Sequence, residues 1–532
     1  MVRAVITDNE ILSPRSPKVG KTKPNITDLR TKNALAIAAD TGQVAKACRS
    51  MSGKRGPEGN AQIKNKIMKM KMYYLRKYIA NRLNALVPFI LFIFFNLSIN
   101  TTNAQTTDFH NWAPTPPMGW NSWDCFGPTV VESEVKANAD YMAKHLKKFG
   151  WEYVVVDIRW YVGNDKAHGY NENNPDYVLD EYGRFQPAIN RFPSAAGGKG
   201  FKPLADYIHK KGLKFGIHIM RGIPVEAVKR NLPILGTKAT ARDIYSPDGQ
   251  CKWLHDMYTV VGGKDGAQEY YNSLFKLYAN WGLDFVKVDD LSRPYHTDEV
   301  NMIRKAIDLT GRKIVLSTSP GETPIESATE VQQHANMWRT VDDFWDNWKM
   351  LKDHFDVFER WNQYRIPGGW PDGDMLPLGR IGIRAERGNP RMAAFTRDEQ
   401  YTLMTLWCIF RSPLMFGGNL PDNDEFTLSL LTNKEVMNIE NNSTNNRELF
   451  RNQHVICWVA DDPKTGDKYV ALFNPTDNVD PVKASVKLSE LGFGGACKVK
   501  DLWNKTDLGT FNGEFAVDIN KHGAGLYRVS AK

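Results

Sequence analysis

The chain has 532 residues, 42% hydrophobic and 11% aromatic, so it is long enough for more than one domain and a large buried core. Its formal charge of +9 does not indicate a nucleic-acid partner. Residues 1–105 hold 18 of the 69 basic side chains but only 5 of the 60 acidic ones, so the remainder is slightly acidic. The six cysteines form no CxxC pair and no His/Cys metal spacing, which argues against a zinc-type site and a disulfide framework.

Residues 72–105 are typical of an export signal. Basic side chains at positions 71, 76, 77 and 82 surround its start, an apolar run follows at 85–97, and Thr102-Asn103-Ala104 offers a cleavage site of small residues. The apolar run is shorter than the roughly 20 residues that span a membrane, although an uncleaved anchor is an alternative. We expect residues 1–71 to be a disordered or misassigned extension, and the mature protein to be exported, periplasmic or extracellular, with no other membrane part.

Short apolar segments then alternate with amphipathic ones. The pattern predicts strands at 153–158, 214–219, 284–289, 313–317 and 335–340, and helices at 201–211, 267–281, 297–309 and 344–364. With the segments 116–123 and 403–414, about eight such units fit between 113 and 435, which favours a (β/α)8 TIM barrel. An open doubly wound sheet is the alternative, but the GxGxxG fingerprint that would support it is absent.

The pattern changes after about residue 440. Short alternating strands are predicted at 455–460, 468–473, 484–487, 498–501 and 525–529, separated by turn-rich stretches. This predicts a C-terminal antiparallel β-sandwich domain over 440–532.

In a β/α barrel the carboxyl ends of the strands surround the active site. The polar and aromatic residues expected there are Trp123, Asp124, Asp157, Trp160, His218, Lys287, Asp289, Asp290, Ser317, Ser319, Arg339, Asp342, Asp343, Asp372 and Asp374. The set is rich in carboxylates and has a single histidine, which argues against a metallohydrolase built on a histidine cluster. The sequence has no GxSxG serine motif either, and we expect no metal and no cofactor.

Two facing carboxyl groups are what hydrolysis of a glycosidic bond requires. Asp289 ends a buried strand, and Lys287 points to the same face of the pleat, where its ammonium favours an ionised nucleophile. Asp342 and Asp343 precede the predicted helix 344–364, where one aspartate suffices as a cap. We assign Asp342 as the capping candidate and Asp343 as the catalytic acid/base.

Five ordered motifs resemble glycoside hydrolase family 27, the α-galactosidases and α-N-acetylgalactosaminidases of the melibiase clan. The motifs are PMGWNSW (117–123), KVD (287–289), WRTVDD (338–343), GWPDGDML (369–376) and SPLM (412–415). The resemblance implies a barrel with a trailing β-domain, a retaining double-displacement mechanism, the nucleophile Asp289 and the acid/base Asp343. In retaining enzymes the two carboxyl groups lie about 5–5.5 Å apart.

The resemblance also implies that five residues bind the sugar: Trp123, Asp157, Lys287, Arg339 and Asp374. From their places at the ends of predicted strands, Trp160, His218 and Ser319 are added to the predicted substrate-binding residues. The substrate would be a galactose-containing oligo- or polysaccharide with a terminal α-D-galactosyl residue.

Three positions depart from the family pattern. Family members usually carry two adjacent aspartates after the second strand, which hold O4 and O6 of galactose, whereas this chain has Asp157-Ile158. The usual tyrosine after the third strand is His218, and a frequent polar or acidic residue after the fifth is Ser319. We expect an α-galactosidase. A β-L-arabinopyranosidase, an α-N-acetylgalactosaminidase, an isomalto-dextranase and, from another class, a non-catalytic glycan-binding barrel are the alternatives.

Overall fold

The computed structural model describes residues 68–69, 72–73, 76 and 109–532. Apart from those first few positions, the predicted extension (1–71) and export signal (72–105) lie outside the described residues, so export stays a prediction. Within the part of the chain that the structure describes, we find no helix with the length and apolarity needed to cross a bilayer.

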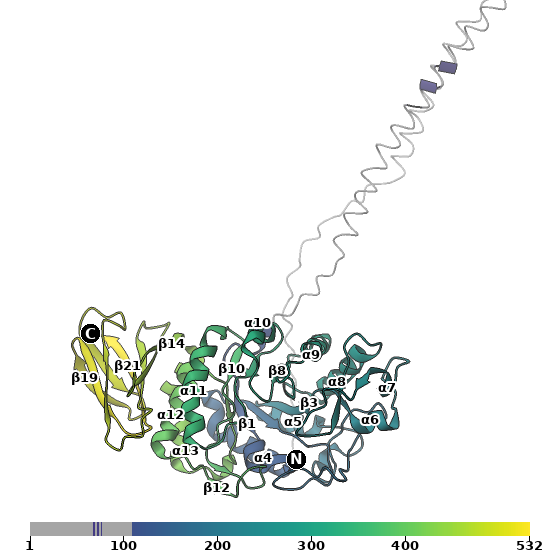
Figure 1. Ribbon diagram of the computed structural model, residues 1–532, viewed down its shortest axis with the longest axis horizontal. Helices are drawn as coiled ribbons and strands as arrows, with labels where there is room; N and C mark the ends of the chain where they lie inside the picture. The colour runs from purple at the N-terminus through teal and green to yellow at the C-terminus, as the bar shows by residue number, and fades with distance from the viewer. Residues whose placement is uncertain (1–67, 70–71, 74–75, 77–108) are drawn as a thin grey trace, which may run out of the picture. The chain divides into compact units, whose positions relative to one another are not determined.

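Eight parallel strands form a TIM-barrel sheet in the order β10-β9-β8-β7-β3-β2-β1-β13. An isolated parallel bridge between Leu376 and Phe416 links the chain after β10 to β13. Most strand residues are buried, as expected for a parallel sheet covered by helices on its outer face (Figure 1). The strands are β1 (Met118–Asn121), β2 (Tyr153–Val156), β3 (Lys214–Met220), β7 (Phe285–Asp289), β8 (Val315–Thr318), β9 (Met337–Arg339), β10 (Trp370–Asp372) and β13 (Leu414–Phe416).

Helices follow most of these strands. They are α3 (Trp123–Phe126), α4 (Glu132–Tyr141), α5 (Lys202–Lys210), α8 (Ala267–Trp281), α9 (Thr297–Leu309), α10 (Ala328–Gln332), α11 (Trp348–Trp361), α12 (Arg397–Phe410), α13 (Glu425–Leu431) and α14 (Lys434–Asn442). A long excursion after β3 adds β4 (Ile223–Pro224), α6 (Val225–Arg230), α7 (Ala241–Ile244), β5 (Tyr245–Ser246) and β6 (Met257–Val260). The short strands β11 (Arg380–Ile381) and β12 (Arg391–Met392) pair with each other.

The predicted helices 267–281 and 297–309 match α8 and α9, but the helix predicted at 344–364 begins later. Asn347 caps α11, because its side chain accepts a hydrogen bond from the Met350 amide at 3.3 Å. The assignment of Asp342 as the cap was therefore wrong. Phe344 lies outside the helix, and its amide donates to Asp374 Oδ2 at 2.7 Å.

The C-terminal part is an antiparallel β-sandwich. Its larger sheet has the order β14-β15-β16-β21-β18-β19, and β17 pairs with β20 in the second. The strands are β14 (Thr444–Arg451), β15 (Ile456–Asp461), β16 (Lys468–Phe473), β17 (Val482–Lys487), β18 (Cys497–Asp501), β19 (Thr506–Phe511), β20 (Glu514–Ile519) and β21 (Ala524–Ala531). The prediction missed β14, β19 and β20. β14 and β19 are the two edges of the larger sheet, and these exposed, mostly polar strands lack an apolar alternation.

Barrel and sandwich share a continuous core. The buried side chains of Trp458, Phe473 and Leu526 belong to the same hydrophobic cluster as the barrel. Phe355 of α11 packs edge-on against Phe473, with ring centroids 5.0 Å apart. The shared packing joins the two domains within one structural unit, residues 104–532.

Candidate active site

A cavity of about 620 Å³ opens at the carboxyl ends of the barrel strands. Seven of the ten residues predicted for the site line it: Trp123, Asp157, Lys287, Asp289, Arg339, Asp343 and Asp374. They come from β7, β9 and the segments that follow β1, β2, β9 and β10, so the parallel sheet brings together side chains far apart in the sequence. Both proposed catalytic carboxyl groups, Asp289 and Asp343, face this one cavity.

Asp289 is the last residue of β7, and two hydrogen bonds hold its carboxyl group in place. Its Oδ2 lies 2.8 Å from Nε2 of the fully buried His218 on β3, and its Oδ1 accepts the Asp290 amide at 2.6 Å. The Lys287 ammonium stays charged: burial lowers its pKa, but Asp157 and Asp289 raise the pKa further and set it above the usual value. These contacts fix the Asp289 carboxyl at the cavity floor beside a positive charge.

Asp343 also lines the cavity and forms a charged trio with Arg339 and Asp374. Arg339 donates to Asp343 Oδ1 at 3.2 Å, and its Nη1 forms an ion pair with Asp374 Oδ1 at 2.8 Å. Burial favours a higher pKa for Asp343, but Arg339 and Lys287 outweigh it and hold the pKa below the ordinary value. Burial and Asp343 together raise the pKa of Asp374 despite the same Arg339. Arg339 lowers the pKa of both carboxyl groups, but only at Asp374 do burial and the neighbouring Asp343 outweigh it, so the two pKa values shift in opposite directions.

Asp157 follows β2 and is a fixed anion. Its Oδ2 accepts hydrogen bonds from Asn121 at 2.7 Å and from Lys287 at 3.1 Å. Burial raises its pKa, but Lys287 and His218 lower it further, so the net pKa is below the ordinary value. The next residue, Ile158, also lines the cavity and adds an apolar wall beside this carboxylate.

Comparison with known proteins assigns the chain to a family. The family model described as alpha galactosidase A matches residues 115–226 and 234–442, and that of the alpha galactosidase C-terminal beta sandwich domain matches residues 453–529. A GH27 β-L-arabinopyranosidase from Geobacillus stearothermophilus is 55% identical, with 80% of this chain and 98% of that chain covered and a TM-score of 0.77. The chain belongs to glycoside hydrolase family 27.

Other family 27 relatives differ in their described activities. A variant of the Geobacillus enzyme, solved in complex with arabinose, is 54% identical with a TM-score of 0.78. A Bacillus halodurans protein, described provisionally as an α-N-acetylgalactosaminidase, is 48% identical over 78% of this chain and 97% of that chain, with a TM-score of 0.71. Alpha-galactosidase 2 of Arabidopsis thaliana is 25% identical over 79% of this chain and 90% of its own. The predicted family and fold are confirmed, and the chain is a glycoside hydrolase that acts on carbohydrate.

Three residues predicted for this family 27 site do not line the main cavity. Trp160 is fully buried, donates from Nε1 to the His218 carbonyl at 2.7 Å and packs edge-on against Phe201. His218 lies behind Asp289, as described above. Ser319 lines a small separate void beneath the cavity, together with Lys287, Arg339 and Asp374. The three residues lie in or just after barrel strands, but only the tertiary packing shows which of the side chains at these positions face the cavity.

The cavity also contains residues that the sequence did not single out. Tyr170 stacks on Trp123, with ring centroids 6.0 Å apart and the planes 21° apart, and Trp253 lies 6.1 Å from Tyr170. Both come from loops of irregular sequence, where no periodicity or motif could have indicated them. They form an aromatic side of the cavity, of the kind that packs against the apolar face of a sugar ring.

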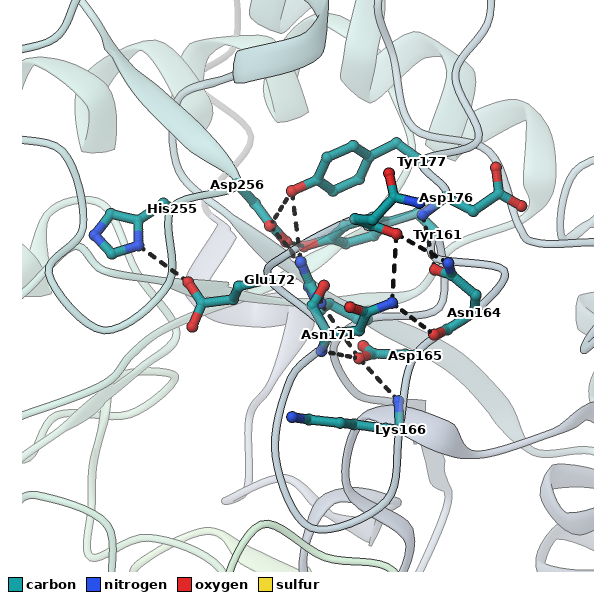
Figure 2. Close-up of polar contacts among 12 residues, drawn as sticks. Tyr161, Asn164, Asp165, Lys166, Asn171, Glu172, Asp176, Tyr177, His255 and Asp256 are labelled. Carbon is teal, nitrogen blue, oxygen red and sulfur yellow. Dashed lines mark hydrogen bonds and ion pairs between the residues drawn. The ribbon is translucent and has the colours of Figure 1, made fainter.

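The loop that carries Tyr170 is anchored by a buried polar network (Figure 2). Asp256 accepts hydrogen bonds from Arg159 at 2.6 and 2.8 Å and from the Tyr161 hydroxyl at 2.8 Å. Asp165 Oδ1 accepts the Asn171 amide at 2.8 Å, which closes the loop just after Tyr170. These hydrogen bonds therefore hold the loop that places Tyr170 at the aromatic side of the cavity.

Within the described parts of the chain, no group of three or more His, Cys, Asp or Glu side chains is arranged to hold a metal ion. The five described cysteines, Cys125, Cys251, Cys408, Cys457 and Cys497, are buried free thiols.

Proposed function

We propose that this glycoside hydrolase is an exo-acting, retaining β-L-arabinopyranosidase. The observation that carries the proposal is Ile158, an apolar side chain in the cavity beside the Asp157 carboxylate. Family 27 α-galactosidases resemble this chain in Asp157 but usually follow it with a second aspartate that binds galactose hydroxyls.

The two sugars differ where Ile158 matters. β-L-arabinopyranose has the ring configuration of α-D-galactopyranose but lacks the hydroxymethyl group on C5. Placing that hydroxyl against an isoleucine, without a hydrogen-bond partner, costs about 1–3 kcal/mol. An unsubstituted C5 loses nothing against the same wall, so the cavity favours the pentose by about 5- to 150-fold.

The relatives support the same choice. The β-L-arabinopyranosidase from Geobacillus is 55% identical over nearly its whole length, whereas a curated α-galactosidase from Cellvibrio japonicus is 29% identical over 70% of its length. The second candidate is an α-galactosidase, which the family model's description and the curated relatives favour.

In the proposed mechanism Asp289 attacks the anomeric carbon and forms a covalent glycosyl-enzyme. Its hydrogen bonds to His218 and to the Asp290 amide orient the carboxylate for attack. Asp157 and Lys287 are placed to bind sugar hydroxyls, and Trp123 to pack against the ring.

Asp343 would protonate the leaving oxygen in the first step and take a proton from water in the second. The lowered pKa of Asp343 suits the role of base in the second step. Its side chain is 38% exposed, so a bound sugar would cover it, and this desolvation favours the protonated acid required in the first step.

Rates on 4-nitrophenyl glycosides of β-L-arabinopyranose, α-D-galactopyranose and α-N-acetylgalactosamine test the proposal. We expect kcat/KM to be about 5- to 150-fold higher for the arabinoside. Ile158→Asp should shift the ratio toward the galactoside by about tenfold or more, because a carboxylate can bind the added hydroxyl.

Ile158→Val is the matched control and should leave the ratio nearly unchanged. Asp289→Asn should lower every measured rate by about 10³-fold or more, since the covalent step is lost. A wild-type preference for the galactoside, unmoved by Ile158→Asp, would establish the second candidate instead.

A further inference from the structure

Asp124 is a buried carboxyl group that the proposed mechanism leaves unused. It lies in α3, directly after Trp123, is 3% exposed and lines the cavity. Its Oδ2 is buried with no hydrogen-bond partner among the described residues. The other acids of the cavity floor differ, since Asp157, Asp289 and Asp374 each accept hydrogen bonds from protein groups.

The surrounding backbone fixes the position of this carboxyl group, although its Oδ2 has no hydrogen-bond partner among the described residues. The backbone of α3 is fixed next to β11, because the Asp124 carbonyl accepts the Gly382 amide at 2.8 Å. On the opposite side Gly417, just after β13, leaves the space that Asp124 occupies. A β-carbon at position 417 would lie 1.9 Å from Asp124 Oδ2, so only glycine admits this side chain.

A buried carboxyl oxygen without a hydrogen-bond partner costs free energy that the fold does not recover. Burial, reinforced by Asp374, raises the pKa of Asp124 well above its usual range, and the opposing effect of Lys287 is weaker. A carboxyl group whose pKa is raised keeps its proton more readily, and in the protonated form it can both donate and accept a hydrogen bond. Such a group at a sugar-binding cavity suits a hydroxyl, which is also both donor and acceptor.

We propose that Asp124 binds one hydroxyl group of the sugar whose glycosidic bond is cleaved, and so helps to determine specificity. This inference rests on the proposed glycosidase function of the cavity. Ile158 stands after β2 where family members usually have a second hydroxyl-binding aspartate. Asp124, which follows β1, supplies a polar group to the cavity from another strand end.

Monodeoxy substrates test the proposal hydroxyl by hydroxyl. The 2-, 3- and 4-deoxy 4-nitrophenyl glycosides are prepared from whichever sugar the wild type prefers, and kcat/KM is measured for wild type, Asp124→Ala and Asp124→Asn. We expect Asp124→Ala to lose about tenfold or more on the parent glycoside, but less than about threefold on one deoxy substrate, where the contact is already missing. Asp124→Asn should stay within about fivefold of wild type, because an amide also donates and accepts.

Thermal unfolding separates binding from a structural role. Asp124→Ala should unfold at the wild-type temperature or above, since it removes an unpaired buried carboxyl group. Asp206→Asn, which breaks an exposed ion pair with Lys202 on α5, is the control and should leave the rates unchanged. Equal losses on the parent and all three deoxy substrates, or no loss on the parent, would overturn the proposal. A wild-type preference for galactosides would refute the proposed arabinopyranosidase but leave the test of Asp124 intact.

Discussion

At the residue scale, the carboxyl groups of the cavity differ in pKa because their surroundings differ. Lys287 and Arg339 hold the pKa values of Asp157 and Asp343 below the ordinary value, although burial acts in the opposite direction. At Asp124 and Asp372 burial prevails, and the pKa of Asp372 rises to about 7. Groups whose environments separate their pKa values in this way are typical of acid/base sites.

Asp372 makes the stability of the protein depend on pH. An aspartate in the unfolded chain has a pKa of about 3.9, whereas burial raises that of Asp372 to about 7. The contribution of Asp372 to the free energy of unfolding is complete below pH 4. It is lost as the pH rises toward 7 and above, because Asp372 ionises more readily in the unfolded chain than in the folded protein. Asp372→Asn does not titrate. We therefore expect the variant to gain free energy of unfolding relative to wild type between pH 5 and pH 8.

Urea unfolding at both pH values measures this difference. Asp353→Asn, at an exposed ion pair on α11, is the control and should show no such trend. A stability difference between Asp372→Asn and wild type that stays constant with pH would contradict the expectation.

At the element scale, the loops decide the form of the cavity more than the strands do. The strands place Asp289 and Arg339 at the barrel end, but Tyr170 comes from the loop after β2. That loop depends on Asp256, which precedes β6 and binds both Arg159 and Tyr161 (Figure 2). The excursion after β3 thereby supports the aromatic side of the cavity.

Asp256→Ala should destabilise this arrangement strongly. It leaves the fully buried Arg159 without its main partner, which costs about 3–5 kcal/mol of unfolding free energy. We also expect faster proteolysis within residues 163–176 and a higher KM, as Tyr170 loses its support. Denaturant unfolding, limited proteolysis and steady-state kinetics measure the three effects.

Glu172→Gln is the matched control, because it breaks the exposed pair between Glu172 and His255 in the same region. It should cost at most about 1 kcal/mol. If both variants lost similar amounts, the buried network would not be the support that we describe.

At the scale of the whole molecule, the sandwich completes the hydrophobic core of the barrel. Trp458 and Phe473 pack in the barrel's cluster, and Trp503 donates to Thr405 Oγ1 of α12 at 2.8 Å. A second cluster, with Val486 and Phe515, lies within the sandwich itself. We infer that barrel and sandwich unfold cooperatively.

Trp458→Ala tests this cooperativity from outside the active site. Truncation of a fully buried tryptophan costs about 3–5 kcal/mol. We expect the temperature of half-inactivation and the calorimetric midpoint to fall together, in one transition. Val479→Ala, at a side chain 86% exposed in the sandwich, should change neither. A sandwich that melted separately, with unchanged inactivation of the barrel, would contradict a shared core.

The sequence by itself determined the features that local patterns encode. Strand and helix periodicity predicted β7, α8, α9 and β16 closely, and ordered motifs identified family 27 together with the candidates Asp289 and Asp343. The structure places both candidates at one cavity. Such features depend on neighbours within a few residues, and these are visible in the sequence.

Only the tertiary structure decided which side chains face the cavity. Trp123 and Trp160 both follow barrel strands, yet one lines the cavity and the other is held in the core by the His218 carbonyl. No periodicity or motif in the segment around Tyr170 indicates that this side chain lines the cavity. The space that Asp124 occupies is left by Gly417, almost 300 positions later in the chain. Each of these placements is set by contacts between segments distant in the chain, and no local pattern records which segments will meet.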